Sequence, residues 1–369
     1  MAASERSRVA SQGAPSYRIL ALQGRGLVPA ARMRIGVIGL GAIGGVIAAK
    51  LLRSRRPDET IALAAGSERA VEAIRRGGIR IRGEPPIPPP ELLGANLSPA
   101  AAPYDVMLLC TRTDASDAAL TAAVQLLAPD GALVCVQNGL PEERAAVRAG
   151  AKRTFGAVIG WSASSDAYGQ YVVTGGGKFI LGAVDGSMDK VMPIKAVLER
   201  AFPVRATSNL RGARWTKLAF NCALSTLGAI SGLDFGGLAA RGDARRLALR
   251  IVGEAIAVAE RRGVKLEKVV GLDPRWFVPG AKPAAFQHVL IWLAARRRPR
   301  QRSGMLQRLA TGRPAGQVDD LNGAVVNAAR EVRLEAPLNA RLRDLVHAIE
   351  RGVETIGTHQ LERLESSCP

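Results

Sequence analysis

The sequence has 369 residues, of which 47% are hydrophobic and 22% charged, and this balance is typical of a folded globular protein rather than a disordered chain. Its 51 Lys and Arg residues exceed its 32 Asp and Glu residues, which gives a formal net charge of +19 and makes a nucleic-acid ligand an alternative to weigh. No run of about 18 apolar residues occurs, so we expect no membrane partner, and the length allows about two domains.

The basic residues do not form a recognisable nucleic-acid-binding module. The densest run is residues 296–302, but aromatic residues make up only 4% of the chain, and we find no module in which stacking residues alternate with basic ones. A solvated surface that attracts an anionic cofactor and substrate explains the charge better. The three histidines and four cysteines have no metal-site or disulfide spacing, which predicts no metal and favours a reducing cytoplasm.

Residues 1–32 are expected to form a flexible basic N-terminal extension. Their arginines far outnumber their single acid, Glu5, a composition similar to that of a transit peptide. An upstream start codon is a simpler explanation, because Met33 immediately precedes the first predicted strand. We expect this segment to be dispensable.

A dinucleotide-binding turn is predicted where the apolar strand 34–38 leads into a helical stretch. Between them lies the run Gly39-Leu40-Gly41-Ala42-Ile43-Gly44. Gly39 makes the strand-to-helix corner, Gly41 lets a pyrophosphate approach the backbone, and Gly44 lets helix and strand pack closely. The helix N-terminus would then hold the diphosphate. An ordinary glycine-rich turn is the alternative.

Strands and helices alternate through the first part of the chain. Apolar strands are expected at residues 60–65, 79–82, 105–110 and 132–137, with helices at 67–76 and 115–127 and β-rich segments at 153–184. This alternation predicts an α/β fold, a Rossmann-type doubly wound parallel sheet over residues 33–205, whose ligands bind beyond the carboxyl ends of the strands. Arg112 and Asn138 follow two such ends.

The pattern becomes helical after residue 211, which predicts an all-α domain over residues 206–352 and a C-terminal tail at 353–369. Helices are expected at 213–231, 244–262, 284–296, 303–310, 319–332 and 340–351. Within the first of them, Lys217, Asn221 and Ser225 are spaced four residues apart and share one face. A lysine beside a ketone oxygen can stabilise its developing charge and deliver a proton. A plain amphipathic helix with a solvated lysine is the alternative.

Residues 33–350 resemble the ketopantoate reductase (2-dehydropantoate 2-reductase) family. The matching segments, in chain order, are 39–44, 137–140, 174–177, 215–218 with Asn221, Glu254, 305–307, 312–314 and 319–323. The Lys217 and Asn221 pair also resembles the β-hydroxyacid dehydrogenases, whereas 137–140 and 312–323 favour the ketopantoate reductases. Several motifs in the right order are more specific than any one of them.

The resemblance implies NADPH-dependent reduction of ketopantoate to pantoate, and it allows a homodimer. It implies that Lys217 is the general acid, that Asn221 positions the substrate and that Glu254 has an interhelical or substrate-side role. Cofactor contacts would come from the glycine turn, Arg69, Arg112 and Asn138. Substrate contacts would come from Asn138, Lys217, Asn221, Ser225, Ser303 and Gln317.

The sequence departs from the family pattern at the cofactor and substrate sites. Ala65 replaces the arginine that usually ends the second strand, so Arg69 would have to reach the 2′-phosphate of NADP. Arg112 replaces a lysine, and Ser225, Gly304 and Gln317 replace an asparagine, a serine and a glutamate. Losing a buried hydrogen bond costs about 1–3 kcal/mol, so these changes around the substrate could alter which substrate is preferred. The first alternative is therefore a related enzyme for another 2-keto or β-hydroxy acid. The second is a non-catalytic nucleotide-binding protein of the same fold.

Overall fold

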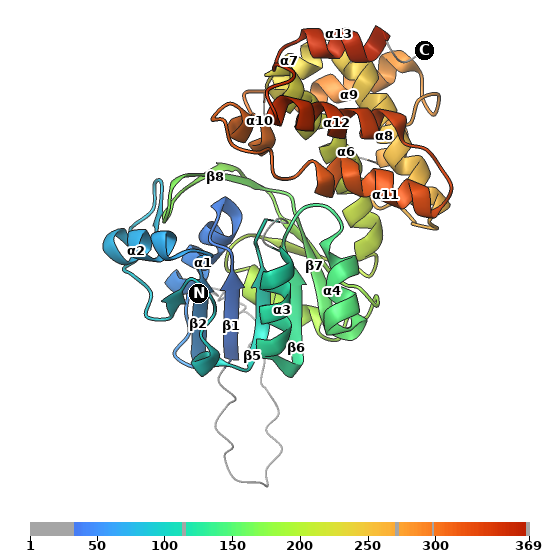
Figure 1. The fold of residues 1–369 in the computed structure, drawn as a ribbon. Helices are drawn as coiled ribbons and strands as arrows, with labels where there is room; N and C mark the ends of the chain where they lie inside the picture. Colours follow the sequence, from blue (N-terminus) through green and yellow to red (C-terminus); the bar gives the residue numbers. More distant parts are fainter. Residues whose placement is uncertain (1–32, 113–115, 270–272, 297–298, 367–369) are drawn as a thin grey trace, which may run out of the picture.

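The computed structural model describes residues 33–112, 116–269, 273–296 and 299–366, so the extension expected at residues 1–32 lies outside the described residues. The described chain forms two lobes (Figure 1). The first is built around a mostly parallel sheet whose last strand ends at Ala206, and the second is helical from Leu210 onward. In the part of the chain described here, no helix has both the length and the hydropathy needed to cross a bilayer.

The sheet of the first lobe has eight strands in the order β11, β10, β7, β6, β5, β1, β2, β4. They are β1 (Met33–Ile38), β2 (Glu59–Ala64), β4 (Leu93–Gly94), β5 (Tyr104–Leu109), β6 (Leu127–Cys135), β7 (Thr154–Ile159), β10 (Phe179–Ala183) and β11 (Val204–Ala206). Six neighbouring strands run parallel to one another, namely β4, β2, β1, β5, β6 and β7, and β10 is antiparallel to β7. Because β1 lies between β2 and β5, the winding reverses beside β1, and a ligand is expected beyond its carboxyl end. The predicted fold class is confirmed.

Helices bury both faces of this sheet. They are α1 (Ala42–Arg53), α2 (Glu68–Gly77), α3 (Ser116–Leu126), α4 (Pro141–Ala149) and α5 (Val191–Leu198). One apolar core joins α1, α2 and α5 to the sheet, and a separate core joins α3 and α4 to it. Figure 1 shows α3 and α4 in front of the strands. The sequence did not predict the short helices α4 and α5.

A second, three-stranded sheet covers α1. Its order is β3 (Arg80–Ile81), β9 (Gln170–Gly175), β8 (Ser162–Ala167), with β8 and β9 forming a hairpin. The hairpin arches over the end of the α/β lobe that faces the helical lobe (Figure 1). Residues far apart in the chain therefore meet above the start of α1.

The helical lobe is organised around the long helix α6. Its helices are α6 (Leu210–Ser231), α7 (Phe235–Ala240), α8 (Gly242–Arg261), α9 (Ala284–Arg296), α10 (Gly304–Leu309), α11 (Ala324–Glu331), α12 (Pro337–Glu350) and α13 (His359–Ser366). The Asn209 side chain caps the start of α6 by accepting the Gly212 N–H, and the left-handed Gly232 ends the helix. One apolar core, which includes Leu218 and Ile251, holds the lobe together.

Two segments of this lobe differ from the helices expected. The helix predicted at 319–332 is divided into a π-helical turn, Asp319–Gly323, and α11. Residues 353–366, expected as a tail, contain α13, which buries Leu361 and Leu364 in the core of the lobe. An extra residue in the helical turn re-aims the backbone, and such turns are frequent at functional sites.

Candidate functional site

The glycine turn between β1 and α1 has a shape that fits a diphosphate. Gly39 has φ +94°, and a Cβ on Gly44 would overlap the Gly39 carbonyl and lie 2.7 Å from the Cβ of Cys110. At Gly41, by contrast, a Cβ would meet nothing within 4 Å, so the space outside the backbone is open. No side chain caps α1, and its first turn contains no acid. The amides at this helix end are therefore available to an anion.

The turn is held in place by a residue far along the chain. The Tyr171 hydroxyl of β9 donates a hydrogen bond of 2.8 Å to the Leu40 carbonyl, and the tyrosine ring occupies the space where a Cβ on Gly45 would lie. Burial raises the pKa of Tyr171 to about 12, so the hydroxyl remains a donor. Sequence analysis did not single out Tyr171, because its contact with the turn depends on how the β8–β9 hairpin folds over α1.

The carboxyl ends of β1, β5 and β6 lie together beside this turn. The Cys110 N–H bonds the Ile38 carbonyl at 2.8 Å, and the Gln137 side chain donates to the Thr111 carbonyl at 2.9 Å. Arg112 is exposed just beyond β5, and Asn138 is partly buried just beyond β6. Among the described residues, no donor reaches the buried Oδ1 of Asn138. This edge of the sheet therefore presents polar groups that a cofactor could engage.

Arg69 lies at another point of the same edge. Ser67 caps the start of α2, which follows the carboxyl end of β2, and Arg69 is exposed in the first turn of that helix. Ala65, directly after β2, is partly buried.

Lys217, Asn221 and Ser225 all lie on α6 and are partly buried. Burial, together with the nearby positive charge of Arg214, lowers the pKa of Lys217 to about 7. Within the described residues, the Lys217 ammonium donates no hydrogen bond. An amine with this pKa can hold or release a proton near neutral pH.

Arg214, which sequence analysis missed, connects α6 to the sheet. Its guanidinium donates to the Gln137 carbonyl at 2.7 Å and to the Cys135 carbonyl at 3.3 Å, and it forms an ion pair with Glu142 of α4. All of these partners lie at or just beyond the carboxyl end of β6. A lone arginine in a helix carries no sequence signal for such a role, because its partners are distant in the chain.

Asn138 and Gln317 meet where the two lobes join. The Asn138 side chain donates to the Gln317 side-chain oxygen at 3.4 Å. Next to it, a Cβ on Gly139 would lie 2.5 Å from the Asp320 carbonyl oxygen, so the lobes approach backbone to backbone. The structure thus brings together Asn138, predicted to contact both cofactor and substrate, and Gln317, predicted to contact the substrate.

Glu254 and Ser303 have structural contacts of their own. The two carboxylate oxygens of Glu254 accept the backbone N–H groups of Leu338 and Asn339 at the start of α12, at 2.9 and 3.0 Å. Of the two roles considered for Glu254, this geometry supports the interhelical one. The buried Ser303 hydroxyl caps α10 by accepting the Leu306 N–H at 3.0 Å.

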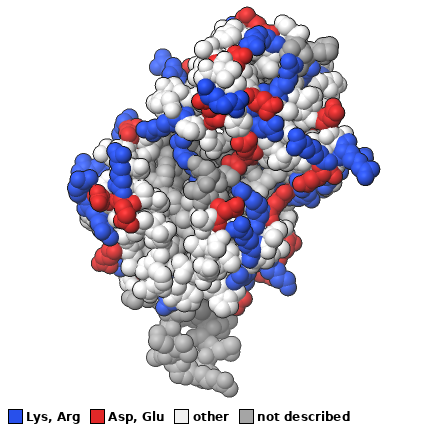
Figure 2. Space-filling model, viewed as in Figure 1, with Lys and Arg blue, Asp and Glu red and all other residues white. Residues whose placement is uncertain are grey.

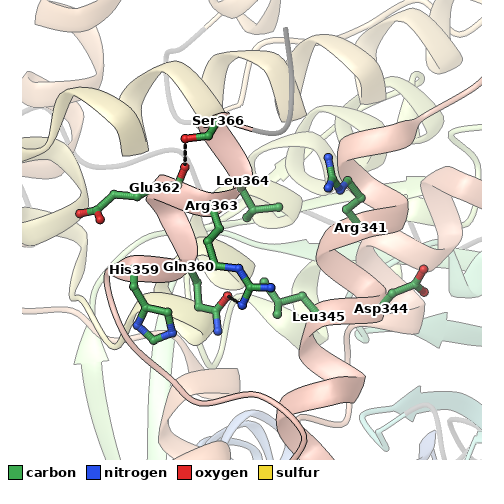
Figure 3. Close-up of a pocket in the computed structure, with 9 residues that line it drawn as sticks. All are labelled: Arg341, Asp344, Leu345, His359, Gln360, Glu362, Arg363, Leu364 and Ser366. Atoms are coloured by element: carbon green, nitrogen blue, oxygen red, sulfur yellow. Dashed lines mark hydrogen bonds between the residues drawn. The ribbon is translucent and has the colours of Figure 1, made fainter.

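Two other surface features lie apart from this site. A groove of about 700 Å³ between α12 and α13 is lined by charged residues such as Arg363, which pairs with Glu354, but by none of the predicted site residues (Figure 3). Lys and Arg side chains are scattered over both lobes with Asp and Glu among them on the face in view (Figure 2). On that face they do not form a continuous basic track of the kind that follows a nucleic-acid backbone.

The comparisons with known proteins agree with this architecture. Residues 35–186 match the family model "Ketopantoate reductase PanE/ApbA", and residues 209–350 match its C-terminal companion. The 2-dehydropantoate 2-reductases of Pyrococcus horikoshii and Mesorhizobium japonicum are 28% and 27% identical to the chain; they match over 86% and 87% of it and over 98% and 99% of their own lengths.

Solved structures show the same two-lobed fold. A PanE/ApbA family ketopantoate reductase from Ralstonia eutropha is 25% identical, with a TM-score of 0.72 over 87% of this chain and 99% of that one. A D-mandelate dehydrogenase solved with NADH and anilino(oxo)acetate is 19% identical, with a TM-score of 0.74 over 88% of this chain and 100% of that one. The two family models together span most of both lobes. The chain therefore belongs to the ketopantoate reductase family and is an oxidoreductase of that family.

Proposed function

We propose that this protein reduces the 2-keto group of ketopantoate to pantoate with NADPH, and that Lys217 donates the proton. The observation that carries the proposal is the partly buried Lys217 ammonium, whose pKa is lowered to about 7, on the helix that Arg214 joins to the carboxyl edge of the sheet. The curated relatives named 2-dehydropantoate 2-reductase support this substrate.

The residues at the sheet edge fit a dinucleotide. The open backbone at Gly41 and the uncapped start of α1 would hold the diphosphate, and Asn138 would contact the nicotinamide end through its side-chain amide. When bound, NADPH supplies the hydride for the carbonyl carbon. The exposed guanidinium of Arg112 beyond β5 would add positive charge on the same side.

Lys217 and Asn221 would act on the substrate oxygen. As hydride reaches a ketone carbon, negative charge grows on its oxygen, and an ammonium beside that oxygen stabilises the charge and then releases its proton. A pKa of about 7 makes Lys217 a stronger acid than an exposed lysine while leaving it largely protonated in mildly acidic solution. Asn221, one helical turn away, would orient the keto acid, and Ser225 and Gln317 would provide further substrate contacts.

Arg69 would select NADPH over NADH. The end of β2 has neither the acid that binds a ribose 2′-hydroxyl nor an arginine, because Ala65 and Gly66 follow the strand. Arg69 is the exposed cation in the first turn of α2, where the helix N-terminus also favours an anion. Glu68, beside it, is the residue that would instead favour NADH.

The test of the catalytic role is Lys217→Ala. We expect turnover of ketopantoate to fall at least about 100-fold while NADPH affinity stays nearly unchanged, as for the loss of a general acid. Lys282→Ala, at an exposed lysine, is the matched control and should retain full turnover. Unaltered turnover in Lys217→Ala would remove this residue from the mechanism.

The substrate and cofactor are tested with NADPH and NADH against a panel of branched 2-keto acids. Oxidation of NADPH with ketopantoate as the best substrate supports the proposal. Activity confined to other keto acids would mean that the enzyme has a different substrate, to which the changes from the family pattern at Ser225 and Gln317 are adapted. Arg69→Ala should weaken the binding of NADPH and leave the binding of NADH unchanged. Equal weakening of both would contradict a contact with the 2′-phosphate.

A further inference from the structure

We propose that Arg214 is a positioning residue, which fixes α6, and with it the Lys217 ammonium, against the carboxyl end of β6 beside Asn138. The inference rests on the proposed role of Lys217 as proton donor. It concerns how the proton donor of one lobe is placed relative to the cofactor side of the other.

The contacts of Arg214 are nearly closed to solvent. Its side chain is 3% exposed and that of Glu142 is 9% exposed, and Gly156 of β7 has no side chain that would occupy the place of the Glu142 carboxylate. The guanidinium also donates to the carbonyls of Gln137 and Cys135. A planar guanidinium that reaches a carboxylate and two carbonyls in fixed directions holds its helix more tightly than a single contact could.

The position of Arg214 in the helix links two functional side chains. Lys217 follows three residues later, so the two side chains lie on neighbouring positions of one face, about 4.5 Å apart along the axis. The Gln137 carbonyl that Arg214 binds belongs to the peptide unit that leads directly into Asn138. One guanidinium therefore sets the location of both Lys217 and Asn138.

Two other ion pairs between the lobes are more exposed than this one. Arg205 pairs with Glu267 with a side chain that is 38% exposed, and Arg262 pairs with Glu143, whose side chain is 46% exposed. Because a buried ion pair is generally no more stabilising than apolar residues of the same volume, stability alone does not account for the Arg214 and Glu142 pair.

The charges around Lys217 agree with this arrangement. Arg214 lowers the pKa of Lys217 in addition to the effect of burial, and Arg214 is itself faced by Glu142 of α4 and Cys135 of β6. Burial raises the pKa of Glu142, while Arg214 opposes that rise. Burial likewise raises the pKa of Cys135, so the thiol adds no charge near neutral pH.

Two variants separate the geometry from the charge. Arg214→Lys keeps a cation but loses the planar fork, and the double variant Arg214→Met with Glu142→Leu removes the ion pair without leaving a buried charge. The matched controls are Arg200→Lys and the double variant Arg200→Met with Glu59→Leu. Arg200 and Glu59 form a similarly buried pair, 10% and 3% exposed. Glu59 is the first residue of β2, however, so this pair lies at the amino ends of the strands, away from the candidate site.

Two measurements are made on each variant. The first is kcat and KM for ketopantoate at pH 6, where Lys217 is protonated. The second is the pH dependence of Lys217 acetylation by acetic anhydride in cofactor-free protein, followed by peptide mass spectrometry with Lys282 as the exposed reference. The second measurement needs neither cofactor nor turnover.

We expect both Arg214 variants to lose about 100-fold in kcat, since a displacement of about 1 Å at a reacting group has that effect. In the double variant the midpoint of Lys217 acetylation should rise by about one pH unit, because a neighbouring positive charge is gone. The Arg200 controls should change neither quantity. Retention of kcat within about threefold in both Arg214 variants, or equal losses in the Arg200 controls, would overturn the proposal.

Failure of the proposed function gives a different result. If Lys217→Ala remains fully active, Lys217 is not the proton donor, whatever the Arg214 variants do. If Lys217→Ala is inactive and the Arg214 variants are unimpaired, the proposed function holds and the positioning role of Arg214 is refuted.

Discussion

The glycine turn and helix α6 form the two halves of the candidate site, and they are built by opposite means. The turn requires Gly39, Gly41 and Gly44 because these residues carry no side chain, and all three lie within six consecutive residues. In α6, the environment of Lys217 depends on a charged side chain, Arg214, and on partners gathered from β6 and α4. Local backbone shape can be read directly from a sequence, whereas an electrostatic environment assembled from distant segments cannot.

The pH dependence of the reaction gives the largest effect and tests the α6 half. Because Lys217 must be protonated to act as an acid, keto acid reduction should be constant well below pH 7 and fall about tenfold per pH unit above it, or roughly 100-fold by pH 9. Oxidation of the hydroxy acid needs the neutral amine and should rise toward pH 7 instead. Initial rates in both directions check this, and a reduction rate that stays level to pH 9 would contradict it.

Gly44→Ala and Gly41→Ala test the turn half. The first places a Cβ against the Gly39 carbonyl and should cost about 1–3 kcal/mol of unfolding free energy, together with cofactor affinity. The second meets no protein atom within 4 Å, so it should reduce cofactor affinity and leave stability nearly unchanged. Urea unfolding and titration with NADPH measure the two quantities. A stable Gly44→Ala protein with native affinity would show that the turn tolerates side chains.

Tyr171→Phe sharpens the comparison, because it asks how far the turn also depends on a distant residue. Loss of the hydroxyl that holds the Leu40 carbonyl should cost about 1 kcal/mol and weaken cofactor binding severalfold. Tyr104→Phe is the matched control, since the Tyr104 hydroxyl donates to the Ser98 carbonyl at 2.9 Å, away from the turn. It should lose similar stability and keep its cofactor affinity. Equal affinities in the two variants would mean that the turn holds its shape unaided.

His347→Gln should have the smallest effect, on the segment that carries Gln317. Burial lowers the pKa of His347, but its hydrogen bonds with Glu350 and Asp319 outweigh this and raise the pKa overall. Its stabilising contribution is therefore complete below the unfolded pKa of about 6.5 and is lost as the pH rises through the folded value. We expect the variant to be destabilised by ~0.5–1 kcal/mol at pH 5.5 and by less at pH 8.5.

His288→Gln serves as the control of opposite sign in the same urea titrations. Burial and the neighbouring Arg245 lower the pKa of His288, so protonation at low pH works against folding and its replacement should relieve that cost. A destabilisation of His347→Gln that does not change with pH would show that its ion pairs are not formed in solution.

The fold could be predicted further from the sequence than the site. The alternating strands and helices and the glycine turn are local patterns, and their order fixed the expected sheet. Lys217 and Asn221 were found because helical spacing places them on one face. Arg214 and Tyr171 gave no signal, since each depends on partners more than 70 residues away in the chain. Glu254 was recognised as a motif residue, but only the packing of α12 revealed what its carboxylate binds.

The backbone contact at Gly139 has a mechanical consequence. Gly139 has φ +80° and its Cα faces the Asp320 carbonyl oxygen, so the smallest side chain inserted there would act as a spacer between the two halves of the molecule. A methyl group at this one position would push Asp320 away from the segment between β6 and α4, without altering any residue that is proposed to react. How closely the two lobes approach at this point thus depends on Gly139 having no side chain.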